Sequence, residues 1–268
     1  MRIPLFHVNA FTREPFRGNP AAVCPLQGWL DDQILRKVAA ENNLSETAFF
    51  VPEAGHRAAH YELRWFTPRG EVRLCGHGTL ASAYVVLDLL EPRLDRVQFE
   101  TRHSGTLTVC RDGDLLAMNF PALVPKACAT LPEGLVSALG AGPRPSDVLE
   151  VNQIYFTVYD KENAIRSMHP DFPRLELLHP FVVGVTAPGE TADFVSRYFK
   201  PSYGTPEDPV TGSAHSALTP YWSQRLGKSR LHARQLSERG GELWCEMAGE
   251  RVVLKGNAVL TMQGTLEL

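Results

Sequence analysis

The stretch that decides the fold is a pentapeptide that occurs twice, as Arg64-Trp65-Phe66-Thr67-Pro68 and as Arg197-Tyr198-Phe199-Lys200-Pro201. Each copy leads into a glycine turn followed by small residues, Cys75-Gly76-His77-Gly78-Thr79 in the first case and Thr211-Gly212-Ser213-Ala214-His215 in the second. The copies lie 133 residues apart (197 − 64) in a chain of 268, which is the spacing of a duplicated half. We therefore predict two similar halves, each with a helix that begins at its glycine turn.

The two predicted helix starts also indicate a function. Backbone N–H groups at a helix N-terminus lack partners within the helix and carry partial positive charge, so each turn is a potential anion site. If the two starts face one another across a cleft, the chain is an enzyme that handles a small acid. The alternative is that glycine serves only close packing at each helix start, and the repetition at half-chain spacing weighs against it.

Composition narrows the possible partners. Hydrophobic residues make up 44% of the chain and charged residues 21%, as in ordinary globular proteins, and the formal net charge of −3 gives no basic footprint for nucleic acid. No apolar run approaches the roughly 20 residues of a membrane-spanning helix, and no signal peptide is recognisable, so a cytoplasmic protein is expected. The five cysteines form no Cys-x-x-Cys pair, which disfavours disulfides and a structural zinc site.

Short β-branched or aromatic stretches between Gly, Pro and Asn predict that most of the chain is strand. The expected strands are 3–11, 21–24, 48–51, 61–66, 97–101, 106–110, 115–120, 148–151, 154–159, 181–186, 243–247 and 251–254, with a hairpin turn at Asp112-Gly113. The fold class is therefore α+β, with two pseudo-symmetric halves in which a curled, mostly antiparallel sheet surrounds a central helix. We place the halves at 1–120 and 121–257, and a final strand at about 258–268 is expected to return to the first half.

Four helices are predicted. Asp31 caps a helix over 32–41 that buries Ile34, Leu35, Val38 and Ala39 and ends at Asn42-Asn43, and a shorter helix is expected near 132–139. The helix over 79–90 carries almost no charge and is predicted to be buried all round. The helix over 213–226 contains Pro220, which predicts a kink or a cost of about 3 kcal/mol if the helix is straight, and Gly227 closes it.

Candidate chemistry lies at four residues. Glu46 precedes the apolar run Ala48-Phe49-Phe50-Val51, so it is either an exposed strand end or a partly desolvated acid able to exchange a proton near neutrality. His77 follows the first glycine turn and either caps the helix or reaches over its start. Asp208 precedes the second helix, where it favours the helix dipole or orients a substrate. Cys75 at a helix start is either a reactive thiol of lowered pKa or a small buried residue.

Cofactor sites are not recognisable. Neither glycine turn matches a phosphate-binding loop, and no histidine pair has the spacing of metal ligands on one helix face. We therefore expect neither a metal nor another cofactor.

Four motifs together resemble the PhzF-like (phenazine biosynthesis) isomerase family over nearly the whole chain. They are Gly18-Asn19-Pro20-Ala21-Ala22-Val23, Leu44-Ser45-Glu46-Thr47-Ala48-Phe49, the segment from Arg64 to Thr79, and Glu207-Asp208-Pro209-Val210-Thr211-Gly212-Ser213-Ala214-His215. The resemblance implies the diaminopimelate epimerase fold, an active site between two halves, and a homodimer. It also implies that Glu46 is the acid/base, and that His77, Asp208, Ser213 and the backbone at Gly76 and Gly212 position a carboxylate substrate. Gly78 and Thr79 belong to the same predicted site.

Departures from related families limit the chemistry. Diaminopimelate epimerases and proline racemases use one cysteine from each half, whereas here Cys75 is matched by Thr211, which disfavours a two-thiol racemase. Arg73 and Gly78 stand where relatives often carry other residues, so the substrate is expected to differ from that of phenazine-making members. The expected function is a cofactor-independent isomerase that moves a proton on a small amino or hydroxy acid. The alternatives are an amino-acid racemase or epimerase, and a binding protein without turnover.

Overall fold

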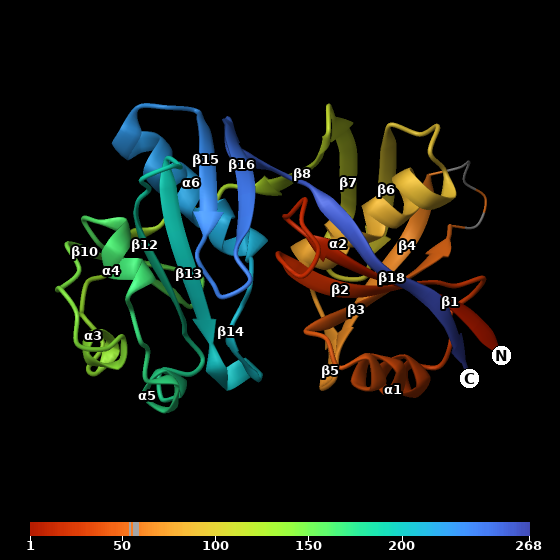
Figure 1. Cartoon of the computed structure of the whole chain (residues 1–268), viewed down its shortest axis with the longest axis horizontal. Coiled ribbons are helices and arrows are strands. Elements are labelled where there is room, and N and C mark those ends of the chain that lie inside the picture. Colours follow the sequence, from red (N-terminus) through yellow and green to blue (C-terminus); the bar gives the residue numbers. More distant parts are fainter. Residues whose placement is uncertain (54, 56–58) are drawn as a thin grey trace. The chain divides into compact units, whose positions relative to one another are not determined.

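The structure is a computed structural model that describes residues 1–53, 55 and 59–268. The described chain forms two compact units (Figure 1). Unit 1 comprises Met1–Asn119 together with Lys255–Leu268, and unit 2 comprises Phe120–Leu254. Each unit combines many strands with a few helices, which confirms the α+β class.

Unit 1 contains nine strands and three helical segments within the described residues. Its elements are β1 (Arg2–Ala10), β2 (Asn19–Pro25), α1 (Asp32–Asn42), β3 (Glu46–Pro52), β4 (His60–Thr67), β5 (Gly70–Val72), α2 (Gly76–Tyr84), the π-helix η1 (Val85–Leu90), β6 (Arg96–Thr101), β7 (Gly105–Asp112), β8 (Leu115–Pro121) and β18 (Ala258–Glu267). β8 ends two residues into unit 2, and β17 (Arg251–Gly256), which begins in unit 2, ends two residues into unit 1.

Unit 2 contains the remaining elements. They are β9 (Lys126–Ala127), α3 (Leu135–Ala138), β10 (Asp147–Val151), β11 (Ile154–Val158), α4 (Glu162–Arg166), α5 (Phe172–Glu176), β12 (Val182–Pro188), β13 (Phe194–Lys200), the 3₁₀ turn η2 (Pro201–Tyr203), β14 (Thr205–Glu207), α6 (Gly212–Leu226), β15 (Arg230–Gln235), β16 (Gly241–Ala248) and β17 (Arg251–Gly256).

The strands of the two units pair in the same succession. In unit 1, β1 is antiparallel to β2, β2 is parallel to β3, β3 is antiparallel to β4, β4 is parallel to β6, and β6 is antiparallel to β7. In unit 2, the pairs β10–β11, β11–β12, β12–β13, β13–β15 and β15–β16 follow the same order of antiparallel and parallel contacts. The short strands β5 and β14 lie antiparallel to β4 and β13, respectively. This agreement is compatible with the predicted repetition of one fold.

The repeated pentapeptide makes the same ion pair in each unit. Arg64 of β4 donates from Nε and Nη2 to the carboxylate of Glu71 on β5, at 2.8 and 2.7 Å. Arg197 of β13 donates in the same way to Glu207 on β14, at 2.8 Å twice. Each guanidinium also lies over the phenylalanine two residues ahead, Phe66 at 4.9 Å and Phe199 at 5.1 Å from the ring centroid. The pentapeptide thus fixes the short strand that leads toward each glycine turn.

Helix α2 forms the inner element of unit 1. It contacts β1, β2, β3 and β18, and its residues from His77 to Ala83 are buried. The helical segment extends to Leu90 as predicted, through η1. The predicted all-round burial holds as far as Leu87 except at the half-buried Tyr84, but it is wrong for Asp88, Leu89 and Leu90, which are exposed. The Glu91 N–H donates to Val86 O at 2.7 Å, a bond five residues long that ends the segment.

Pro220 lies inside α6, which runs without interruption from Gly212 to Leu226. Proline has no N–H to donate to the carbonyl four residues earlier, which belongs to Ser216. That carbonyl accepts a hydrogen bond from Leu123 N at 3.0 Å instead. The chain segment after β8 therefore satisfies the group that Pro220 leaves open, and Gly227 ends α6 in the left-handed conformation as predicted.

Several local predictions need correction. In α1, Asp31 caps the helix and Leu35, Val38 and Ala39 are buried, but Ile34 faces solvent. The helix near 132–139 is a single turn, α3, because Gly134 adopts a left-handed conformation directly before it. The β7–β8 hairpin turns at Gly113-Asp114, one residue later than expected, since Asp112 still pairs with Leu115. Strands β13 and β15 were not predicted as such.

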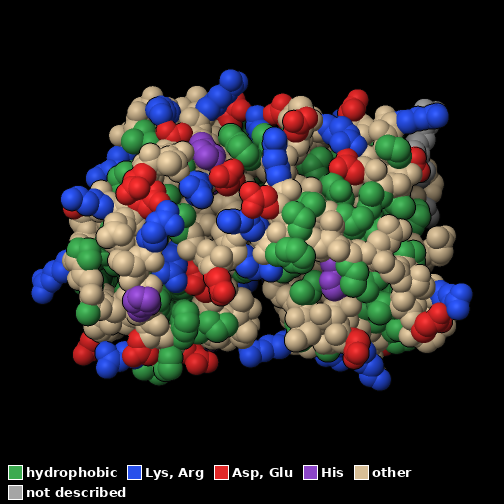
Figure 2. All heavy atoms as spheres, viewed as in Figure 1, with side chains coloured by type: hydrophobic (Ala, Val, Ile, Leu, Met, Phe, Trp, Pro, Cys, Tyr) green, Lys and Arg blue, Asp and Glu red, His purple; other side chains and the backbone are tan. Residues whose placement is uncertain are grey.

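The surface charge and the length of the helices bear on possible partners of the protein. Figure 2 shows acidic and basic side chains interspersed on the visible face. Among the described residues, no helix is both long enough and apolar enough to cross a membrane.

Candidate active site

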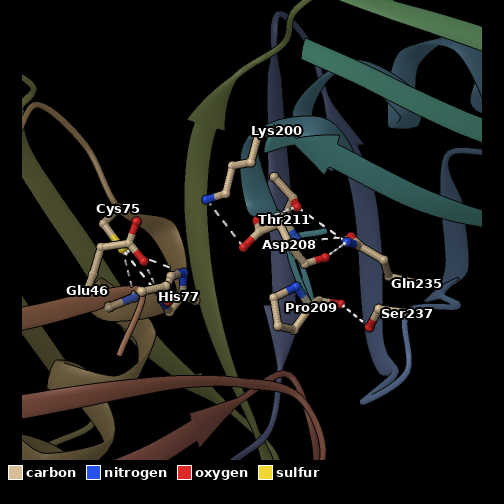
Figure 3. Close-up of polar contacts among 11 residues, drawn as sticks. Glu46, Cys75, His77, Lys200, Asp208, Pro209, Thr211, Gln235 and Ser237 are labelled. Carbon is tan, nitrogen blue, oxygen red and sulfur yellow. Dashed lines mark hydrogen bonds and ion pairs between the residues drawn. The ribbon is translucent and has the colours of Figure 1, made fainter. Parts of the chain in front are cut away.

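Glu46 and His77 meet in unit 1 because the first residue of β3 lies beside the first turn of α2 in space. Glu46 is the first residue of β3, beside Ala21 of the parallel strand β2. Cys75 caps α2, where its Sγ accepts from Gly78 N at 3.3 Å, and His77 is the second helical residue. Figure 3 shows the three side chains converging. Glu46 and His77 are thus in direct contact within one unit.

The contact among the three side chains is polar and buried. Nε2 of His77 lies 3.2 Å from Oε2 of Glu46. Sγ of Cys75 lies 3.5 Å from Nδ1 and 3.8 Å from Nε2 of the same ring. Glu46 is 8% exposed, and Cys75 and His77 are each 6% exposed. The interpretation of Glu46 as an exposed strand end is therefore wrong.

Burial and neighbouring charge act in opposite directions on His77. Burial favours the neutral ring, but the neighbouring Cys75 sulfur and Glu46 carboxylate outweigh it and raise the pKa of His77 above its usual range. An imidazolium beside the carboxylate of Glu46 fixes the orientation of that carboxylate through a charge-assisted contact.

Burial has the larger effect on Cys75. It raises the pKa of the Cys75 thiol, although His77 and the Gly78 N–H act the other way. Of the two alternatives for Cys75, the small buried residue is confirmed and the reactive thiol of lowered pKa is wrong, because the sulfur is removed from water.

Gly78 and Thr79 serve the start of α2. A Cβ at Gly78 would lie 2.9 Å from both Cys75 Sγ and Trp65 Cδ1, so this position has no space for a side chain. The hydroxyl of Thr79 donates to Cys75 O at 2.7 Å, and Thr79 is fully buried. Its proton is therefore used within the helix rather than offered outward.

Asp208 lies at the centre of a second polar cluster, in unit 2 (Figure 3). Its Oδ2 accepts from Thr211 Oγ1 at 2.5 Å, and Lys200 Nζ lies 3.4 Å from its Oδ1. Gln235 is buried beneath the turn, where its Nε2 donates to Asp208 O at 2.7 Å and its Oε1 accepts from Thr211 N at 2.9 Å. This cluster fixes the chain immediately before α6.

The start of α6 combines one exposed and one buried polar residue. Gly212 opens the helix and is buried, whereas Ser213 is exposed. His215 is fully buried, and its Nδ1 donates to Thr211 O at 2.8 Å. Burial lowers the pKa of His215 to about 4, so the ring is neutral at pH 7.

Sequence reasoning missed two members of the second cluster. Lys200 was quoted only as part of the pentapeptide, and its charge next to a conspicuous aspartate was the available signal. Gln235 ends β15 and gives no signal in the sequence, because its role depends on a contact 27 residues away.

Comparisons with known proteins agree with this architecture. The family model described as phenazine biosynthesis-like protein matches residues 8–264. An uncharacterized isomerase of Pseudomonas aeruginosa is 53% identical over 268 residues, covering 100% of both chains. The crystal structure of a PhzF family protein from Enterococcus faecalis is similar with a TM-score of 0.93 and 40% identity, covering 100% of both chains. A hydroxyproline epimerase from Agrobacterium vitis shares the fold, with a TM-score of 0.61 and 13% identity over 99% of this chain and 92% of that chain.

The chain therefore has the fold of the PhzF family protein, which the hydroxyproline epimerase shares. The chain belongs to the phenazine biosynthesis-like (PhzF) family, and it is an isomerase.

Proposed function

We propose that this isomerase moves a proton on a small amino or hydroxy acid, with Glu46 as the acid/base and without a cofactor. The observation that carries the proposal is the buried Glu46 carboxylate 3.2 Å from His77 Nε2 at the start of α2. A carboxylate with little water around it and a fixed orientation is suited to proton transfer at carbon.

The proposed step is balanced within one substrate molecule. The Glu46 carboxylate takes a proton from a carbon next to an electron-withdrawing group, and the electron pair of that C–H bond moves into the adjacent unsaturated system. Glu46, now protonated, returns the proton to another carbon of the same molecule. His77 touches the carboxylate and keeps it aimed at the reacting carbon throughout.

The helix starts provide donors for the substrate. The free N–H groups at Gly76 and His77, and separately those at Gly212 and Ser213, suit a carboxylate and the negative charge that develops on deprotonation. The exposed Ser213 adds a hydroxyl. Asp208 is proposed to meet an amine or hydroxyl of the substrate, in exchange with its neighbour Lys200. Gly78 and Thr79 support this site by fixing the α2 start.

A racemase with two thiol bases is the second candidate, and two observations weigh against it. The position that matches Cys75 is Thr211, whose hydroxyl is a far weaker acid and already donates to Asp208. Burial also raises the pKa of Cys75, which reduces the thiolate available as a base. The alternative of a binding protein without turnover does not explain why a buried carboxylate, Glu46, contacts a histidine, His77.

Isotope exchange in heavy water tests the function without knowledge of the product. A panel of small cyclic, amino and hydroxy acids is incubated with the protein, and deuterium uptake is measured by mass spectrometry. We expect uptake in at least one acid, and we expect Glu46→Gln to reduce its rate by about 10² to 10⁴, because the amide keeps the shape but cannot accept the proton. Full exchange by Glu46→Gln would exclude the assignment.

Two variants make the test specific. Glu53→Gln changes a carboxylate just beyond the opposite end of β3 and is expected to keep the exchange rate. Cys75→Ser keeps a capping oxygen at the start of α2 and is expected to cost little. A loss with Cys75→Ser as large as that with Glu46→Gln would revive the thiol-base mechanism. We further expect a homodimer located in the cytoplasm.

A further inference from the structure

A buried glutamine holds both ends of the turn that leads into α6. Gln235, at the end of β15, is 1% exposed. Its Nε2 donates to Asp208 O at 2.7 Å and to Thr211 Oγ1 at 3.3 Å, and its Oε1 accepts from Thr211 N at 2.9 Å. Figure 3 shows the amide group of Gln235 facing this turn. All polar groups of a buried amide are thus used on the two ends of one turn.

The turn depends on side chains for its main-chain hydrogen bonds. Asp208 N donates to a carbonyl of β13 at 2.9 Å. Beyond it, Asp208 O and Thr211 N bond to Gln235, and Pro209 O accepts from Ser237 Oγ at 2.8 Å. Proline has no N–H to contribute. Because buried backbone groups must be paired, the conformation of the turn depends on Gln235 and Ser237.

The same bonds decide what Thr211 does at the start of α6. Thr211 is the N-cap residue of this helix. A threonine in that position usually accepts a hydrogen bond from the N–H of the second or third helical residue. Here its hydroxyl donates to Asp208 Oδ2 at 2.5 Å and accepts from Gln235 Nε2 at 3.3 Å, and it caps none of the described residues of the first turn. At α2, by contrast, the Cys75 sulfur accepts from Gly78 N at 3.3 Å.

We propose that Gln235 is a positioning residue of the substrate site. It keeps the Thr211 hydroxyl out of the capping position, so that the first N–H groups of α6 stay available to a carboxylate. It also fixes the main chain that carries the Asp208 carboxylate. Gln235 itself does not touch the ligand, because it is buried beneath the turn. The effect on the substrate rests on the proposed function, whereas the conformation of Thr211 does not.

The crystal structure of a variant tests the positioning directly. Gln235→Met has nearly the same length but can make none of the three bonds, so Asp208 O and Thr211 N lose their partner. We expect the Thr211 hydroxyl to move into the capping position, within about 3.2 Å of Ser213 N or Ala214 N. If Thr211 Oγ1 stays bonded to Asp208 Oδ2 as in the unmodified chain, the proposal is overturned. Gln235→Asn, which keeps the amide but is one methylene shorter, takes its place if Gln235→Met does not fold.

Exchange kinetics test the consequence for the substrate. The acid with the fastest Glu46-dependent deuterium uptake is the probe, and its KM and kcat for exchange are measured with each variant. We expect Gln235→Met to raise KM by about 10- to 100-fold, the effect of one lost hydrogen bond to a charged group. We expect kcat to stay within about twofold, because the contacts of Glu46 with His77 lie within unit 1. A fall in kcat with unchanged KM would contradict the positioning role.

Two further variants separate positioning from loss of stability. Thr186→Val removes another buried hydroxyl of unit 2, which donates to Val195 O at 2.7 Å and accepts from Trp222 Nε1 at 2.9 Å. We expect it to lower the Tm but to keep KM. Adding Thr211→Val to Gln235→Met removes the hydroxyl that would cap α6, and is expected to bring KM back toward that of the unmodified chain. A purely structural role of Gln235 predicts instead that KM rises with Thr186→Val and rises further in the double variant, and either result overturns the proposal.

The positioning role and the proposed function fail in different ways. If no acid takes up deuterium, the proposed function fails, and the crystal structure alone decides whether Gln235 holds Thr211. If Glu46-dependent uptake occurs and Gln235→Met keeps the KM of the unmodified chain, the function stands and the positioning role fails.

Discussion

Acidification is expected to destabilise unit 2 through His215. The fully buried ring has a pKa of about 4 in the folded protein, against 6.5 for an unperturbed histidine. Its Nδ1 donates to Thr211 O, while Nε2 has no hydrogen-bond partner among the described residues. A proton bound to Nε2 would therefore have no acceptor for a hydrogen bond. Protonation of this ring would place an uncompensated charge next to Phe194 and inside α6.

The sign and the size of the effect follow from proton binding. Between about pH 6.5 and pH 4 the unfolded chain binds a proton at His215 that the folded chain does not, so stability falls as the pH falls. The pKa difference of about 2.5 units corresponds to about 3.4 kcal/mol, at 1.36 kcal/mol per unit. Above about pH 6.5 both states are neutral, and below about pH 4 both are charged, so the effect is confined to this window.

Urea unfolding at a series of pH values, monitored by tryptophan fluorescence, measures this contribution. Trp222 stacks on Phe194 beside His215 and reports on unit 2. His215→Asn keeps an N–H for Thr211 O but does not titrate, so the difference between it and the unmodified chain cancels the effects of other groups. We expect the unmodified chain to lose about 3 kcal/mol relative to this variant between pH 6.5 and pH 4.

His103→Asn, which changes an exposed histidine, is the control for this experiment. This variant is expected to keep the pH dependence of stability of the unmodified chain. If His215→Asn and the unmodified chain lose stability in parallel, or if nuclear magnetic resonance finds the His215 ring charged at pH 6, the reasoning from burial is refuted.

Two further predictions concern packing and the repeated ion pair. Gly78→Ala is expected to destabilise unit 1 by about 1 to 3 kcal/mol in urea unfolding, because the new Cβ would meet Cys75 Sγ and the Trp65 ring at 2.9 Å. Unchanged stability would mean that these two side chains move aside without cost. Arg197→Lys is expected to lower the free energy of unfolding by about 1 to 3 kcal/mol, because an ammonium cannot keep both bonds to Glu207 and the bond to Met168 O. The control is Arg2→Lys at the exposed pair with Glu267, and an equally small loss of stability in both variants would contradict this prediction.

The features that were predictable from sequence are those encoded locally. The helices that follow the two glycine turns and the cap at Asp31 depend on neighbouring residues, and the structure has them, although α2 begins at Gly76, three residues before the predicted start. The burial of Glu46 and the raised pKa of Cys75 depend on β3 and α2 packing together, which periodicity does not encode. The same holds for Gln235, since its partners lie in another segment of the chain.

The position of β18 has a consequence for how the protein is made. β18 pairs along the whole of β1, from Arg2 beside Glu267 to Ala10 beside Ala258, and the amino group of Met1 donates to Leu268 O. Unit 2 is continuous in sequence, whereas unit 1 combines a segment before unit 2 with a segment after it. During translation β1 emerges some 250 residues before β18, the strand that pairs along its whole length. The unit that carries Glu46 is therefore synthesised first and completed last, and its unpaired β1 edge is open to chaperones or to misassembly during that interval.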